Sequence, residues 1–359
     1  MNIDDSFIED KVTRILDTAL KVDGTSASHA YTVRSNISQG FLDVIFNLPT
    51  SFPLDKDLND NILKIIIGGL YPILTVFTNN GPNFVETGSQ DFSTARAMRF
   101  YFKVGQYSRL RFESLDDCKM IGSKIPLMNG YDYDLYSGAG HLGLSGSSGG
   151  GKTRLLCYLV GCANSVPNAT IKIIDPKLDY TLYNFAKSRN LDYYSPSGNM
   201  NDYFTDVINV LSSAIDEIHN RQKLILESGV NDLPPFIVAL DEATALSASI
   251  NDNKRVKELQ ALITQICLMG RSARVFLWIS SQSFDASSGA LNSTSRDQMG
   301  LKIVLSSNPT VSDCRYLFKD FDPSSLVINH DGFEKGLGIA QIQSDNRIVP
   351  FMAPYIGGI

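Results

Sequence analysis

The sequence predicts an α/β protein in which a mainly parallel sheet, covered by helices, follows a smaller α+β domain. From about residue 121, short unbroken apolar segments alternate with segments of helical spacing, a pattern typical of strands buried on both faces. A glycine-rich turn stands between one such strand and the next helix. Because 359 residues exceed one ordinary core, we expect domains at residues 1–120 and 121–359.

The first domain opens with a helical pattern at 7–20, followed by a strand at 40–49 and further core at 60–78. In residues 96–113, Gly105-Gln106 lies between two alternating runs, which predicts a β-hairpin. Five cations and three phenylalanines are interleaved there. A DNA-facing hairpin fits this pattern, but we favour a solvated outer face over an aromatic inner face.

The second domain reads as strand, loop and helix in repetition, without an internal repeat of sequence. Short apolar strands are expected at 141–146, 171–175, 236–241, 275–280 and 301–306. Helical spacing is found at 153–163, 206–228 and 256–270. Such alternation predicts parallel strands with helices on both faces of the sheet.

Composition and charge exclude several classes of protein. With 43% apolar and 19% charged residues, the chain is neither disordered nor fibrous. A net charge of -6 rules out a wholly basic nucleic-acid coat, although a few local cations suffice to hold DNA in a ring or groove. Five cysteines without a CxxC pair indicate reduced core thiols, and the acidic N-terminus is no signal peptide, so we expect a cytoplasmic protein.

The strongest chemical signal is the phosphate-loop pattern G-x-x-x-x-G-K-[ST] at 146–153. Glycines let backbone N–H groups turn toward phosphates, and the N-terminus of the next helix adds partial positive charge. We expect ATP as ligand, with Lys152 reaching its β- and γ-phosphates and Thr153 holding Mg²⁺. The predicted phosphate-binding residues are Gly146, Ser147, Ser148, Gly149, Gly150, Gly151, Lys152 and Thr153.

Two adjacent acids, Asp241 and Glu242, end the apolar strand at 236–241. Sheets of this class bind ligands at the carboxyl ends of their strands. We expect Asp241 to hold the water shell of Mg²⁺ and Glu242 to polarise the water that attacks the γ-phosphate. Gln282, at the tip of the strand at 275–280, is a candidate sensor of that phosphate or an ordinary surface amide.

The order of short motifs resembles the FtsK/SpoIIIE motor domains. The segments are IPLMNGYD (125–132), IIDPK (173–177), EIHNR with GVNDL (217–233), ALDEA (239–243), GRSARVFLWISSQ (270–282) and SDCRYLF (312–318). The likeness covers roughly residues 120–345. It implies a RecA-like ATPase that forms a hexameric ring and pumps double-stranded DNA, and it makes residues 1–120 the counterpart of the smaller domain before the motor.

The resemblance also implies further site residues. Arg315 lies where the family places an arginine that acts on a neighbouring subunit's γ-phosphate, with Arg271 and Arg274 as alternatives. Residues 283–298 match the loop that faces the pore, so Ser287, Ser288 and Arg296 are candidate DNA contacts, although a disordered surface loop explains them equally well. Lys177 is a further candidate near the subunit interface.

Two departures shift the expected process. The family's Thr-Arg pair is Leu301-Lys302 here, and from residues 1–359 we expect neither a winged-helix module nor N-terminal membrane spans. The coupling protein or translocase of a conjugative or other mobile element fits better than a septal motor. Alternatives are an FtsK-like ATPase that moves or recruits a protein, such as a relaxase or secreted substrate, an ATPase acting on single-stranded DNA, and a non-hydrolysing assembly protein.

Overall fold

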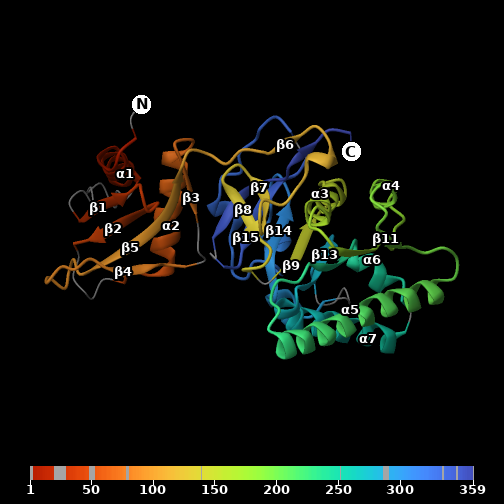
Figure 1. Cartoon of the computed structure of the whole chain (residues 1–359). Helices are drawn as coiled ribbons and strands as arrows, with labels where there is room; N and C mark the ends of the chain where they lie inside the picture. The colour runs from red at the N-terminus through yellow and green to blue at the C-terminus, as the bar shows by residue number, and fades with distance from the viewer. Residues whose placement is uncertain are drawn as a thin grey trace. The chain divides into compact units, whose positions relative to one another are not determined.

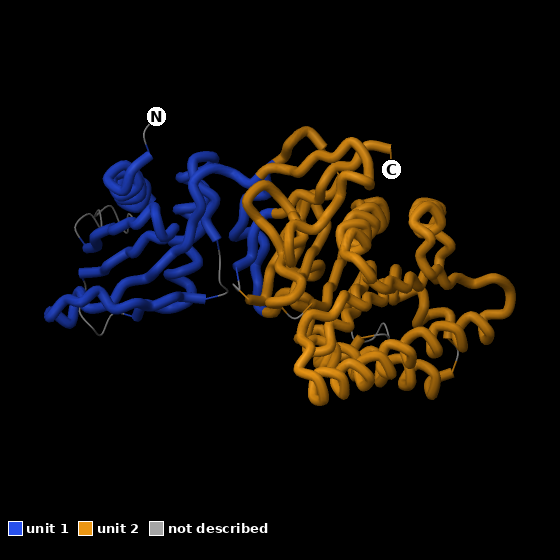
Figure 2. Tube along the Cα trace, viewed as in Figure 1, with its two compact units in different colours: residues 1–107, 320–329, 347–350 blue, residues 108–319, 330–346, 351–359 orange. Residues whose placement is uncertain are grey.

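The computed structural model forms two compact units, coloured separately in Figure 2. Unit 1 contains residues 1–107, 320–329 and 347–350, and unit 2 the remainder. The sequence predicted a boundary near residue 120, whereas the structure divides between Tyr107 and Ser108. The described residues are 3–19, 30–47, 53–77, 81–138, 140–250, 252–285, 291–333, 335–344 and 347–358.

Unit 1 packs two helices against a five-stranded antiparallel sheet (Figure 1). The helices are α1 (Asp5–Ala19) and α2 (Lys56–Leu70). The sheet runs in the order β1-β2-β5-β3, with β4 also paired to β5. Its strands are β1 (Tyr31–Asn36), β2 (Phe41–Phe46), β3 (Leu74–Phe77), β4 (Phe84–Glu86) and β5 (Arg96–Val104). Ile8, Val12 and Leu16 recur every four residues on α1, so they form one fully buried stripe.

The predicted hairpin at 96–113 is wrong. β5 pairs with β2, β3 and β4, while β6 (Arg111–Phe112) pairs in parallel with β17 (Tyr355–Ile356). At Gly105, where φ is +78°, the N–H donates to the carbonyl of Ile73 at 2.8 Å, and the chain then leaves the sheet instead of folding back. Phe100 and Phe102 nevertheless lie in the core of unit 1, as the favoured interpretation of this segment expects.

Unit 2 contains the strands from β11 to β15 of an eight-stranded sheet, whose order is β11-β10-β12-β13-β9-β14-β15-β16. The pairs from β11 through β14 are parallel, and β15 is antiparallel to β14. The strands are β9 (His141–Gly146), β10 (Thr170–Ile174), β11 (Asp192–Tyr194), β12 (Phe236–Leu240), β13 (Val275–Ser281), β14 (Met299–Leu305), β15 (Leu337–Ile342) and β16 (Ile348–Met352). The carboxyl ends of the parallel strands therefore share one edge of the sheet.

Helices cover both faces of this sheet. Figure 1 shows α3 (Lys152–Asn164) and α4 (Tyr180–Ser188) on one side, with α5 (Met200–Ser228) and α7 (Asn253–Met269) on the other. Shorter elements are α6 (Ala243–Ala248), α8 (Ser293–Asp297), α9 (Val311–Cys314), and the hairpin of β7 (Lys124–Met128) and β8 (Tyr131–Asp134). Figure 1 thus confirms the α/β class. No helix among the described residues is long and apolar enough to cross a membrane.

Candidate functional site

The phosphate-loop residues 146–153 join the end of β9 to the start of α3. A side chain at Gly146 would place its Cβ 2.7 Å from the carbonyl oxygen of Leu305 on β14, so the loop passes too close for any other residue. Gly151 caps α3 with a φ of +100°, in the left-handed region. The two glycines therefore allow a tight loop directly before the N-terminus of α3, where the helix carries partial positive charge.

Lys152 is buried at the first position of α3. Its Nζ donates to the carbonyl oxygens of Gly146 at 2.7 Å and Ser147 at 3.1 Å, so the side chain folds back over its own loop. Burial lowers the pKa of the Lys152 ammonium, while the carboxylates of Glu242 and Asp241 act in the opposite direction. The ammonium is therefore held in a partly desolvated place where an anionic ligand is strongly favoured.

The acids Asp241 and Glu242 follow β12, as their spacing predicted, and both are buried. Burial raises the pKa of Asp241 to about 6, and the neighbouring carboxylates of Asp175 and Glu242 add to this rise. Glu242 adopts a φ of +52°, unusual for a residue with a side chain. Its Oε1 accepts the backbone N–H of Gln282 at 3.0 Å, and its Oε2 lies 3.0 Å from the Nζ of Lys177.

These groups line one cavity of about 310 Å³. The parallel pairing of β9, β13 and β12 brings the phosphate loop, Gln282 and the two acids to the same edge of the sheet. Gln282, the candidate sensor, follows β13, which is the neighbour of β12, and it lines the cavity. The lining residues are Ser148, Gly149, Gly151, Lys152, Thr153, Arg154, Lys177, Asp179, Asp241, Glu242, Gln282 and Lys335.

The cavity wall offers ligands suited to Mg²⁺. Thr153 contributes a hydroxyl and Asp241 a carboxylate, and hard divalent cations prefer such oxygen atoms. A cation bound there would also compensate the burial of Asp241, whose pKa is raised because burial disfavours the charged carboxylate. The donor set therefore fits magnesium bound through few protein ligands and shared with phosphates.

A second cavity of about 320 Å³ shares Gly151, Arg154 and Lys335 with the first. Its walls are mostly apolar, and they include the rings of Phe333 and Tyr355, whose centroids lie 5.2 Å apart. The remaining lining residues are Arg109, Leu155, Gly332, Gly336, Ala353, Pro354 and Ile356. A flat apolar group attached to a phosphate chain would find the phosphate loop at one end and aromatic surface at the other.

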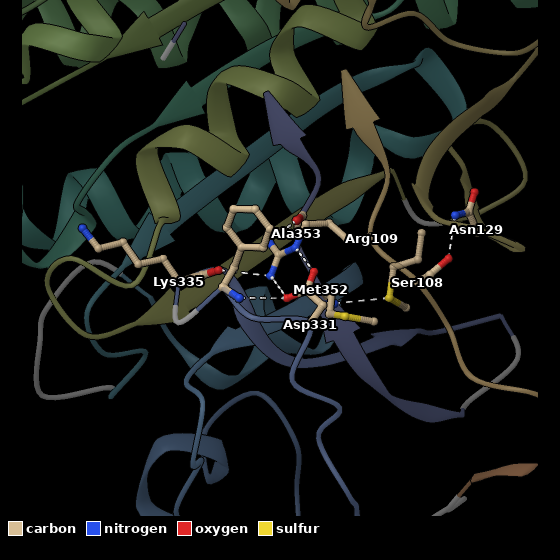
Figure 3. A network of polar contacts seen from close by, with 9 residues as sticks. Ser108, Arg109, Asn129, Asp331, Lys335, Met352 and Ala353 are labelled. Carbon is tan, nitrogen blue, oxygen red and sulfur yellow. Dashed lines mark hydrogen bonds and ion pairs between the residues drawn. The ribbon is translucent and has the colours of Figure 1, made fainter. Parts of the chain in front are cut away.

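Arg109 holds the wall of this second cavity together (Figure 3). Its side chain is 4% exposed, and its Nε and Nη2 donate to Asp331 at 2.7 and 3.2 Å. Nη1 donates to the carbonyl oxygen of Ala353 at 2.6 Å, and Nη2 also reaches that of Lys335 at 3.2 Å. A buried guanidinium thus ties three distant segments of the chain into one structure.

The wall is also joined directly to the phosphate loop. The N–H of Gly336 donates to the carbonyl oxygen of Gly150 at 3.1 Å, and the N–H of Ala353 donates to that of Gly336 at 2.7 Å. Sequence reasoning missed Arg109, Phe333 and Tyr355 as site residues. Arg109 was placed in the hairpin, and no motif marks the other two, because their meeting depends on the fold alone.

Several other predicted residues lie away from these cavities. Arg315 is exposed after α9, with its guanidinium 5.8 Å from the ring centre of Tyr316. Arg274 bonds Asp232 and Leu233 where β13 begins, at the opposite edge of the sheet from the phosphate loop; Arg271 precedes it in the same turn. Arg296 donates to the carbonyl oxygen of Phe284 at 2.5 Å. Ser287 and Ser288 lie outside the described residues.

Comparison with solved structures finds proteins that share this fold. The pCW3 conjugation coupling protein TcpA, solved in a monomer form with ATPγS, has a TM-score of 0.53 and 15% identity, over 96% of this chain and 95% of that one. EssC (ATPases 2 and 3) from Geobacillus thermodenitrificans has a TM-score of 0.51 and 17% identity, over 70% of this chain and 48% of that one. No family model matches the sequence, and no curated protein matches it. The chain therefore shares its fold with a conjugation coupling protein over nearly its whole length.

Proposed function

We propose that this protein is an ATP-driven translocase of double-stranded DNA, with a RecA-like motor of the FtsK/SpoIIIE type. The observation that carries the proposal is one cavity in which a phosphate loop, two strand-end acids and an amide from the neighbouring strand meet. Paired acids beside a phosphate loop are the equipment of a hydrolase rather than of a simple nucleotide binder. The fold shared with TcpA, solved with ATPγS, supports ATP as the nucleotide.

In this proposal the nucleotide spans both cavities. The triphosphate lies along the phosphate loop, where Lys152 exchanges the carbonyl oxygens of its own loop for phosphate oxygens. The base lies in the second cavity, against the rings of Phe333 and Tyr355. Thr153 and Asp241 would hold Mg²⁺, which would supply positive charge against the charge that develops on the phosphates.

The chain's own residues then arrange hydrolysis. Glu242 accepts a proton from the water that attacks the γ-phosphate in line, and Gln282 faces the same space from the tip of β13. The backbone N–H of Gln282 also holds Oε1 of Glu242 at 3.0 Å, so the positions of the amide and the carboxylate are coupled. Arg315 of a neighbouring subunit is our candidate for the cation that completes the site.

The proposed substrate is duplex DNA in the pore of a hexameric ring, in the transfer or replication of a mobile element in the cytoplasm. The fold of TcpA, a conjugation coupling protein, supports this setting over nearly the whole length of the chain. Ser287, Ser288 and Arg296 stay candidate contacts to the DNA backbone. The net charge of -6 is compatible, because only pore-facing groups have to attract phosphate.

The first experiment removes the cation of the phosphate loop. We expect Lys152→Ala to lower magnesium-dependent ATP hydrolysis by at least about a hundredfold, because one preorganised charge on the transferring phosphoryl group is lost. Lys187→Ala, an exposed lysine of α4, is the matched control. Hydrolysis by Lys152→Ala at the parent's rate would contradict the assignment of the site.

The second experiment separates binding from chemistry. Glu242→Gln keeps the size of the side chain but removes the base, so ATP binding should persist while turnover falls about a hundredfold or more. Glu258→Gln, an exposed residue of α7, controls for loss of one negative charge. Loss of binding together with turnover would show that Glu242 serves the fold or the ligand rather than water activation.

A second candidate function is an ATPase that moves or recruits a protein. The family resemblance of the motor segments leaves this function open, and the fold shared with EssC, an ATPase, over 70% of this chain is compatible with it. ATPase rates measured with duplex DNA, single-stranded DNA, RNA, a relaxase or no addition, at stated salt concentrations, separate the candidates. Stimulation by duplex DNA supports translocation of duplexes, whereas stimulation by a protein alone supports the second function.

A further inference from the structure

Lys177 faces the phosphate cavity from the turn after β10, and the function proposed above assigns it no role. Its Nζ lies 3.0 Å from Oε2 of Glu242, whose Oε1 accepts the backbone N–H of Gln282. A carboxylate accepts a proton through an oxygen lone pair that faces the attacking water. In the arrangement that the structure shows, both oxygens of Glu242 already have partners, and one partner is a cation.

The backbone of the turn that carries Lys177 is held by buried hydrogen bonds, whereas the side chain of Lys177 is partly exposed. The carboxylate of Asp175, which is fully buried, accepts the N–H of Lys177 at 2.8 Å and that of Asp179 at 2.7 Å. It also accepts the hydroxyl of Tyr193 at 2.6 Å. The side chain of Lys177 is 43% exposed, against 5% for Glu242. The backbone is therefore fixed, and four flexible methylenes let the charge move along the cavity wall.

A triphosphate offers Lys177 a better partner than Glu242. Its terminal phosphate carries more charge and presents three oxygens, whereas the carboxylate carries one charge and shares it with the N–H of Gln282. Lys177 lines the same cavity as Lys152 and Thr153, so a phosphate chain on the loop passes within the space that Lys177 faces.

We propose that Lys177 changes partners when ATP binds, leaving Glu242 for the terminal phosphate. The exchange frees Oε2 of Glu242 to accept the proton of the attacking water, so the base becomes available only when there is a γ-phosphate to attack. This inference rests on the proposed function, since it takes the cavity to be an ATP site. It makes Lys177 a residue that recognises ATP over ADP within its own subunit.

The direct test uses ATP and ADP derivatives that carry an acyl group on the terminal phosphate and transfer it to a lysine amine in contact. Proteolysis and mass spectrometry then identify the acylated lysines. We expect the ATP derivative to label Lys152 and Lys177, and the ADP derivative to label Lys152 but not Lys177. Exposed Lys187 should remain unlabelled in both, and Glu242→Gln should increase labelling of Lys177 because its competing partner is gone.

Equilibrium binding provides the second measurement. Lys177→Met should weaken binding of a non-hydrolysable ATP analogue about tenfold while leaving ADP affinity within about twofold, because one charge-assisted contact to the γ-phosphate is lost. Lys177→Arg, which keeps the charge, should recover most of the preference for ATP. Lys187→Met is the matched control, and thermal unfolding of each variant shows whether it folds.

The outcomes separate the two proposals. Labelling of Lys152 without Lys177, together with an unchanged ratio of ATP-analogue to ADP affinity in Lys177→Met, would overturn the partner exchange and leave the ATP site intact. Absence of label from both lysines, with no measurable nucleotide binding, would overturn the ATP site itself. The labelling is done on the parent protein, so it stands even where a variant fails to fold.

Discussion

Buried polar side chains at the two edges of the sheet in unit 2 have different surroundings. Where β12 and β13 begin, Arg221 of α5 donates to the carbonyl oxygens of Pro234 at 2.7 Å and Ala273 at 3.0 Å, and to Glu217 at 2.5 Å. Where β9 begins, Nδ1 of His141 accepts the N–H of Leu277 at 3.0 Å. Arg221 and Nδ1 of His141 are therefore bonded to nearby groups of the protein, chiefly to backbone.

At the opposite edge, the buried polar groups surround a cavity. Lys152, Asp241 and Glu242 are as buried as Arg221, yet all three line a space of about 310 Å³. Burial of charge is costly in both places, but only this edge leaves room for a ligand to compensate it. The contrast teaches that burial alone does not mark a site, whereas burial around a cavity does. Substitutions at the first edge should therefore cost stability, and substitutions at the second should cost activity.

The largest effect on stability is expected for Arg221→Met. The substitution leaves the carbonyl oxygens of Pro234 and Ala273 buried without their donor, so we expect a loss of about 3–5 kcal/mol in the free energy of unfolding. Lys223→Met, whose pair with Glu227 is exposed, should change it by less than about 0.5 kcal/mol. Urea unfolding measures both. If Arg221→Met and Lys223→Met change the free energy of unfolding equally, the buried bonds of Arg221 do not stabilise the fold as proposed.

A smaller effect, dependent on pH, is expected at His141. Burial lowers its pKa to about 4, below the ordinary 6.5, so the folded state binds fewer protons than the unfolded state between these values. The contribution of His141 to the free energy of unfolding is fully present above about pH 6.5, and it falls by about 2–3 kcal/mol as the pH drops to 4.5. In His141→Asn this contribution should be lost, so the drop in stability from pH 7 to 4.5 should be about 2–3 kcal/mol smaller than in the parent, while exposed His219→Asn should follow the parent. Urea unfolding from pH 7 to 4.5 measures the slopes, and parallel curves for parent and His141→Asn would refute the assignment.

The smallest effect is expected at Asp241, where a substitution should raise the free energy of unfolding instead of lowering it. The pKa of Asp241, raised to about 6 by burial, means that stability is lost as the pH rises from about 3.8 through 6. Without nucleotide or magnesium, Asp241→Asn should raise the free energy of unfolding by about 1–2 kcal/mol at pH 7.5, with no gain near pH 4. ATP hydrolysis by the same variant should be lost. If Asp241→Asn is less stable than the parent at pH 7.5, the carboxylate of Asp241 stabilises the fold, as the guanidinium of Arg221 does.

The candidate site was predictable as far as its residues are contiguous in sequence. Lys152 and Thr153 follow a glycine turn, and Asp241 and Glu242 end an apolar strand, so local pattern and the rule about strand ends place them together. The alternation of strands and helices likewise predicted the α/β class. The catalytic roles of Lys152, Thr153, Asp241 and Glu242 stay predictions until the variants are measured.

The rest depends on contacts between distant segments. Arg109 was read as part of a hairpin, because alternation and a glycine describe local geometry and say nothing of which strand becomes the partner of β5. The rings of Phe333 and Tyr355 meet only because β15 and the C-terminal segment return to the phosphate loop. The resemblance makes Lys177 a candidate residue near the subunit interface, and only the structure shows that it pairs with Glu242 of its own chain.

The Arg109 network has a practical consequence for dissecting the molecule. Asp331 and the carbonyl oxygen of Ala353 both depend on a guanidinium that precedes residue 120. A truncated protein that starts at residue 121 would contain Asp331 without Arg109, its cationic partner. A protein that ends before Ala353 would lose the hydrogen bonds of Ala353 to Arg109 and to Gly336, which itself bonds the phosphate loop at Gly150. Anyone who trims the protein for crystallisation or tethering should cut before Ser108 and spare the final residues.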